Sequence, residues 1–192
     1  MKRVFLHRNT IIAICLLLLG SLAEAKAQSS SDNTTVDVDI NLISPPPSCS
    51  FTLQSDLAYG TAEKPTSGSG SVTINARTGS RTSSGTAVSG SSSVGQVRLS
   101  GSNVSSYTVT RSFPSTLTRS GGSLSFSGSW AQSVSSSSSY STISSSSYNG
   151  SAGGAGSSFT RYFRYGSTVS GISTGDPDGN YAGTISASAT CN

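Results

Sequence analysis

Short runs of alternating apolar and polar residues dominate the chain after its first 30 residues. The clearest run spans residues 35–43, where the polar positions are Asp37, Asp39 and Asn41. Its apolar positions are Val36, Val38, Ile40 and Leu42. Because successive side chains of a strand point to opposite faces, this run predicts a strand with one buried face. Many such short runs, without helical periodicity after the N-terminal segment, predict an all-β sandwich or barrel.

The N-terminal segment has the three parts of a secretory signal peptide. A basic start at Lys2 and Arg3 precedes an apolar run over residues 11–19, and Ala25-Lys26-Ala27 fits a small-x-small cleavage site. The apolar run is shorter than the roughly 20 residues of a membrane-spanning helix. We therefore expect residues 1–27 to be a cleaved signal peptide. The mature chain is then extracytoplasmic (periplasm, cell surface or secreted) with no membrane span, and the alternative is a retained anchor.

Removal of the signal peptide changes the charge and the available chemistry. The formal net charge of the full chain is +4, but residues 28–192 contain eight basic and seven acidic residues, a net charge of +1. Nucleic-acid binding requires a dense basic face, so no nucleic-acid partner is expected. The single histidine, His7, lies in the signal peptide, which excludes Ser-His-Asp and Cys-His catalysis in the mature chain. We expect no enzyme activity, no cofactor and no metal site.

Two cysteines remain in the mature chain, Cys49 and Cys191. Each lies on the apolar face of a predicted strand, one near residues 49–53 and the other in the last strand, residues 180–191. An even pair of cysteines in an exported protein predicts a disulfide. This bond would join the two ends of one domain.

The predicted strands define three segments. Residues 28–47 comprise a flexible lead, the strand at 35–43 and a proline hinge at 45–47, because proline cannot donate to a β-ladder. Residues 48–192 form the sandwich domain. Within it, residues 132–158 are nearly all Ser, Gly and Tyr, which predicts either a long loop or two weak edge strands carrying Tyr140, Ile143 and Tyr148.

The strand at 35–43 is a candidate donor strand. A flexible lead before it and a proline hinge after it are what donor-strand assembly requires, in which one subunit's extension completes the sheet of the next. Its apolar residues Val36, Val38, Ile40 and Leu42 would then enter the neighbouring subunit. The alternative is that the strand pairs within its own sandwich.

Two further groups of residues are candidates for ligand contact. Trp130, Tyr140 and Tyr148 would present amphipathic rings for stacking on sugars, and the alternative is that they pack over a thin core or edge. Asp176 and Asp178 are spaced for calcium, although Asp176-Pro-Asp-Gly179 is also an ordinary turn sequence, and we favour the turn.

Several motifs, taken in order, resemble a family of secreted bacterial sandwich domains of unknown function. They include Leu57-Ala-Tyr-Gly-Thr61, Val97-Arg-Leu-Ser-Gly101 and Gly179-Asn-Tyr-Ala-Gly-Thr184, and the resemblance covers roughly residues 50–190. The spore coat protein U and archaic pilin domains are similar in outline. This chain departs from them in lacking a second cysteine near Ile74 and an acidic residue after the final Gly-x-Tyr. The resemblance implies an immunoglobulin-like antiparallel β-sandwich and no reaction.

We therefore expect an exported, non-catalytic protein of the cell envelope, a structural or fimbria-like surface assembly component. Its partners would be other envelope or pilus-like subunits. The alternative is an adhesin that binds carbohydrate through the Tyr-rich loop, with glycans as partners.

Overall fold

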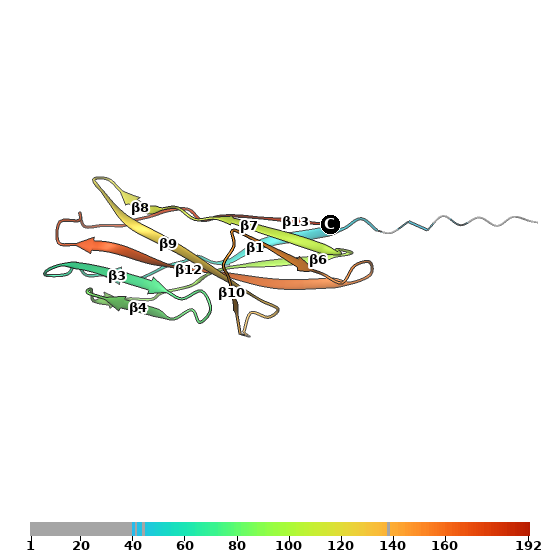
Figure 1. Ribbon diagram of the computed structural model, residues 1–192, viewed down its shortest axis with the longest axis horizontal. Coiled ribbons are helices and arrows are strands. Elements are labelled where there is room, and N and C mark those ends of the chain that lie inside the picture. The colour runs from blue at the N-terminus through green and yellow to red at the C-terminus, as the bar shows by residue number, and fades with distance from the viewer. Residues whose placement is uncertain (1–39, 41, 44, 138) are drawn as a thin grey trace, which may run out of the picture. The chain divides into compact units, whose positions relative to one another are not determined.

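The computed structural model describes residues 40, 42–43, 45–137 and 139–192 (Figure 1). Over these residues every regular element is a β-strand. The strands are β1 (Ser48–Ser55), β2 (Thr61–Ala62), β3 (Ser69–Ile74), β4 (Arg81–Ser84), β5 (Val88–Ser89), β6 (Gly95–Ser102), β7 (Ser106–Ser112), β8 (Thr116–Arg119), β9 (Gly122–Ser133), β10 (Ser141–Ile143), β11 (Ser147–Ser151), β12 (Ser158–Ser173) and β13 (Ser186–Cys191). No helix long and apolar enough to cross a membrane occurs in this part of the chain.

The longest strand, β12, organises the larger sheet. It pairs with β6 over residues 158–165, with β3 over 167–173 and with β9 over 162–170, always antiparallel. β1 adds to β6 as an edge strand, β4 adds to β3, and β8 and β10 pair with β9. A bulge near Gly171, which has a φ of +83°, lets the long strand bend as it passes β3.

The second layer is a three-stranded sheet in the order β11-β7-β13, also antiparallel. Its central strand places Tyr107 and Val109 in the core against Leu99 and Phe163 of the larger sheet. The alternating apolar residues of β6, β7 and β9 are the ones the sequence pattern placed inside, because one face of each strand packs between the layers. The predicted all-β, antiparallel β-sandwich is confirmed.

Residues 132–158 are more ordered than a single long loop. After β9, the chain turns back as β10 against β9 in the larger sheet, then continues as β11 against β7 in the smaller one. The Trp130 Nε1 donates a hydrogen bond to the Ser145 carbonyl, 2.8 Å away, in the connection between these strands. The two-strand alternative is therefore correct, and this segment crosses from one layer to the other.

The predicted start of the last strand was wrong. The last strand begins at Ser186 instead of Asn180, because the preceding residues form a turn and a single bridge between Thr118 and Ala182. Hydrogen bonds within this turn stabilise it, because the Asp176 carboxylate accepts from the Ser173 backbone N–H and hydroxyl.

Candidate functional site

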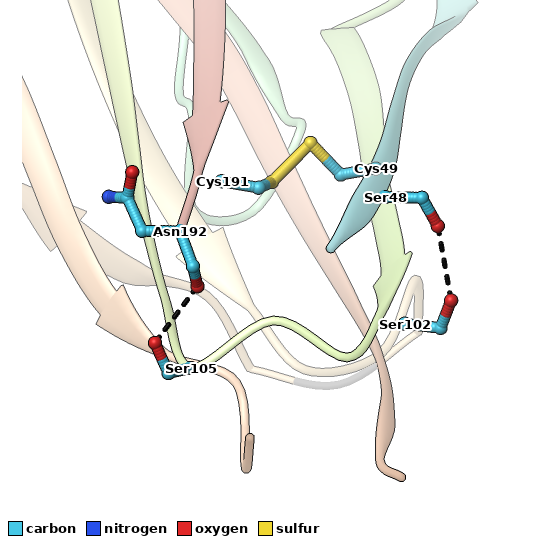
Figure 2. The surroundings of a disulfide bond; sticks show 6 residues. All are labelled: Ser48, Cys49, Ser102, Ser105, Cys191 and Asn192. Carbon is cyan, nitrogen blue, oxygen red and sulfur yellow. Dashed lines mark hydrogen bonds between the residues drawn. A yellow bond between two sulfur atoms is a disulfide. The ribbon is translucent and has the colours of Figure 1, made fainter. Parts of the chain in front are cut away.

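Two sheet edges without strand partners lie beside each other on one side of the sandwich. β1 pairs only with β6, and β13 pairs only with β7, so one side of each is unpaired among the described residues. The disulfide between Cys49 and Cys191 joins these two strands, with 6.4 Å between their Cα atoms (Figure 2). The predicted bond is therefore present, and it links the two layers across this side. A disulfide indicates an oxidising environment.

Two hydrogen bonds beside the disulfide each join neighbouring segments of the same sheet. The Ser48 and Ser102 hydroxyls lie 3.1 Å apart, and the Ser105 hydroxyl donates to the Asn192 carbonyl at 2.9 Å (Figure 2). No hydrogen-bonded ladder joins β1 to β13 in the described chain. The sulfur bridge is thus a clasp at one end of an otherwise unpaired seam.

Leu53 is an inward-pointing side chain that is left exposed along this side of the sandwich. It stands opposite Val97 in the β1–β6 ladder, and Val97 is a core residue that is 8% exposed. Cross-strand partners point to the same face of a sheet. Leu53 therefore points toward the interior, yet 62% of its surface is exposed. The orientation of Leu53 matches that of Cys49 on the apolar face of the strand predicted near residues 49–53, but the Leu53 side chain is not buried.

The opposite wall of the seam is lined by small side chains. In β13, Ala187, Ala189 and Cys191 share the inward face, and all three are only half-buried. Phe51 across the seam is half-buried as well. We call this feature the open seam; it is bordered by the chain from Cys49 to Lys64 on one side and from Asp176 to Cys191 on the other.

The open seam leads at its far end to a pocket of about 490 Å³. Its floor is apolar and consists of Val72, Leu117, Leu124, Val169 and Ile172. Its rim is formed by residues 59–62 and 64 from the β1 side and by residues 176–181 from the β13 side. Lys64 ties the rim together, because its Nζ lies 2.8 Å from an Asp178 carboxylate oxygen and donates to the Asp176 carbonyl.

Tyr59 and Tyr181 place partly buried hydroxyls at this pocket. Burial raises the pKa of Tyr59 to about 12, partly offset by its hydrogen bond with the Ser167 hydroxyl. The Tyr181 hydroxyl donates to the Pro177 carbonyl at 3.0 Å. Sequence reasoning missed both tyrosines as site residues. The available signal was position: Tyr59 follows the first edge strand, and Tyr181 follows the Asp-Pro-Asp-Gly turn.

The candidate donor strand lies only partly within the described residues. Val36 and Val38 fall outside them. Ile40 and Leu42 are described, and their side chains are 79% and 83% exposed.

The predicted aromatic platform is wrong for two of its three residues. Trp130 is completely buried, and Tyr140 is 2% exposed beneath the Arg164 guanidinium, which lies 4.0 Å from its ring centre. Tyr148 is half-buried against Tyr107 and Phe163. Trp130 and Tyr140 belong to the core because β10 and β11 fold the Ser-rich segment back over the sheets. These two rings offer no exposed face on which a sugar could stack.

The acidic residues near the pocket are engaged in local contacts. Asp176 caps its own turn, and Asp178 pairs with Lys64, which lowers the pKa of that carboxyl. No group of three or more metal-ligating His, Cys, Asp or Glu side chains occurs in the part of the chain described. The arrangement offers an apolar pocket and unpaired backbone edges, which suit the binding of an extended chain.

The fold and its open seam define a disulfide-clasped β-sandwich with two adjacent unpaired edge strands. The chain belongs to the family described as "Domain of unknown function (DUF4402)", whose model matches residues 49–190. The predicted relationship to a sandwich family of unknown function is therefore confirmed at that level, and nothing links the chain to spore coat protein U or to pilins. No curated protein and no solved structure matches the chain.

Proposed function

We propose that this protein is an exported, non-catalytic subunit of a surface assembly, in which residues 35–43 of one copy complete the sandwich of another. The protein would act outside the cytoplasm, in the periplasm or at the cell surface. Its principal partner is then a further copy of the same chain or a related envelope subunit.

The observation that carries this proposal is the uncovered Leu53. An inward-pointing leucine that remains 62% exposed supports an added strand, because closed sandwiches bury such side chains and no strand of the described chain covers this one. The adjacent edges of β1 and β13 offer unpaired N–H and C=O groups to an incoming strand. The segment at 35–43 supplies the matching pattern, apolar on one face and polar on the other.

The location rests on independent features. The N-terminus has a basic start, then an apolar run, then a small-x-small site, which is the order typical of a signal peptide. The Cys49–Cys191 bond fits an oxidising compartment. The alternative of a carbohydrate-binding adhesin loses support, because Trp130 and Tyr140 are buried.

Light scattering coupled to size-exclusion chromatography of the mature protein tests the proposal. The unmodified chain should form concentration-dependent multimers. Leu42→Asp should yield monomers, because a carboxylate would be buried without a partner in the neighbour's seam. Asn41→Asp, which adds the same charge on the opposite face, should still assemble.

Deletion of residues 28–44 extends the test. Loss of multimers with an unchanged circular dichroism spectrum would support donation between copies. Unfolding of the truncated monomer would instead show that the segment pairs within its own sandwich. An unmodified mature protein that stays monomeric at all concentrations would contradict the proposal.

A further inference from the structure

We infer that the pocket at the end of the open seam is the socket for Leu42 of a second copy, so that the incoming strand runs from the disulfide toward the pocket. This inference rests on the proposed function and specifies the direction of the strand and the occupant of the pocket. In this arrangement Val36 lies about 20 Å from Leu42 along the seam, on the side toward the disulfide, and residue 43 leaves the neighbour beside residues 176–181.

The two ends of the open seam have different walls. At the disulfide end, the Cα atoms of Cys49 and Cys191 are 6.4 Å apart, and the neighbouring wall residues are Ala187 and Ala189. At the far end lies a pocket of about 490 Å³ with a floor of valine, leucine and isoleucine. The seam therefore accepts smaller side chains at the disulfide end and larger ones at the pocket.

The candidate donor strand has the same gradient of size. Its first two apolar residues, Val36 and Val38, are smaller than the last two, Ile40 and Leu42. Alternate residues lie about 6.6 Å apart, so Leu42 lies about 20 Å beyond Val36 along an extended strand. Running from the disulfide to the pocket matches the smaller side chains to the side toward the disulfide and Leu42 to the pocket.

The chain between Leu42 and Ser48 is too short for a copy to insert its own strand in this direction, so the strand must come from another copy. The antiparallel pairing of β1 with β6 continues to the bridge between Ala58 and Ser93, so Ser48 and the pocket rim are separated by about 33 Å. Six peptide units join Leu42 to Ser48, and these span at most about 22 Å. A copy therefore cannot place Leu42 in its own pocket. In the reverse direction, residue 43 would lie at the disulfide end, and the copy could fill its own seam as a hairpin.

This direction also determines how copies follow one another. Residues 45–47 are three prolines, which favour an extended, semi-rigid spacer. A strand that leaves the seam at the pocket places the disulfide end of the donor next to the pocket end of the acceptor. Repetition of this head-to-tail contact generates a linear polymer.

Cysteine cross-linking in the full mature chain tests the direction. Ala62 is a small, exposed residue on the pocket rim and suits replacement by cysteine. One variant carries Leu42→Cys with Ala62→Cys, and a second carries Val36→Cys with Ala62→Cys; each single replacement serves as a control. After mild oxidation, the first variant should give a ladder of covalent multimers on a non-reducing gel, with the 42–62 cross-link identified by peptide mass spectrometry. The second variant and the single replacements should lack the ladder.

The other outcomes are distinguishable. Multimers cross-linked through residues 36 and 62 would reverse the strand direction and overturn this inference while leaving the proposed function intact. Non-covalent multimers without either cross-link would likewise overturn the assignment of Leu42 to the pocket and leave the proposed function intact. A 36–62 cross-link within one chain would show that each copy fills its own seam, which overturns both. Monomers throughout, including the unmodified protein, would contradict the proposed function itself.

Discussion

The described chain covers the core on one long side of the sandwich, and on the other side the two sheets are joined mainly by a disulfide. On one side, the segment containing β10 and β11 crosses from the larger sheet to the smaller one and seals the largest side chains of the core. Trp130 and Tyr140 are almost fully inaccessible there. On the other side, β1 and β13 meet at a disulfide, and Leu53 remains largely exposed.

Among the described residues, the core is covered on one side and partly open on the other. The closed side uses aromatic packing, in which Trp130 stacks against Phe163 and Tyr165. Alanines line one wall of the open seam, and a disulfide joins its two walls at one end. A covalent clasp holds the two layers together where apolar burial is insufficient, which is the usual role of disulfides in exported domains.

The largest expected effect comes from removing the clasp. Replacing Cys49 and Cys191 together by serine should destabilise the monomer by up to about 5 kcal/mol, because the bond closes a loop with a sequence separation of 142. Urea denaturation followed by tryptophan fluorescence measures this change. A loss below about 1 kcal/mol would show that the seam is held by other contacts.

On the closed side, Trp130→Ala should cost about 3–5 kcal/mol, through lost burial and the cavity left behind. The change also removes the hydrogen bond to the Ser145 carbonyl. The same denaturation experiment reports the effect. A small loss would contradict the view that this side is sealed by its own chain.

Alkaline pH should weaken the pocket end. Tyr59 has a folded-state pKa of about 12 against an ordinary value of 10.0, so its neutral form is favoured by folding. Its contribution is fully present below pH 10 and is lost as the pH rises toward 12, since the unfolded chain releases its proton first. Burial also raises the pKa of Tyr107, Tyr140 and Tyr165. The free energy of unfolding should therefore fall between pH 9 and pH 12, and it should fall less steeply for Tyr59→Phe. Equal slopes would show that ionisation of Tyr59 does not cause the loss of stability.

The smallest expected effect on stability comes from Leu53→Ser on the open seam. Because Leu53 is largely exposed in a single copy, the free energy of unfolding of the monomer should change by no more than about 0.5 kcal/mol. Assembly should nevertheless weaken, as seen in the multimer fraction by light scattering. A large loss of monomer stability would show that Leu53 is already covered.

The alternating pattern was sufficient to predict an all-β fold of short strands, and the family resemblance supplied the sandwich. Val97 and Leu99 alternate with polar residues and are buried, because burial of one strand face follows from the local sequence. The disulfide was also predictable, since only two cysteines, Cys49 and Cys191, lie outside the predicted signal peptide.

The site was less accessible to sequence reasoning. Tyr140 lies in a Ser-rich stretch that has little apolar content, and only the return of that stretch across β9 and β7 buries it. The pocket at Tyr59 and Tyr181 brings together residues more than 100 positions apart, which no local pattern encodes. Leu53 has the same pattern as a buried residue, and it is exposed because no strand of the described residues lies on the other side of β1.

Amide hydrogen exchange at β13 tests the central claim most directly. In multimers of the unmodified protein, N–H groups on the free edge of Ser186–Cys191 should exchange much more slowly than in the Leu42→Asp monomer, because an incoming strand would satisfy or cover them. Amides of β11, on the closed side, should exchange alike in both. Equal exchange of the β13 amides in multimer and monomer would contradict the claim that a second copy fills the open seam.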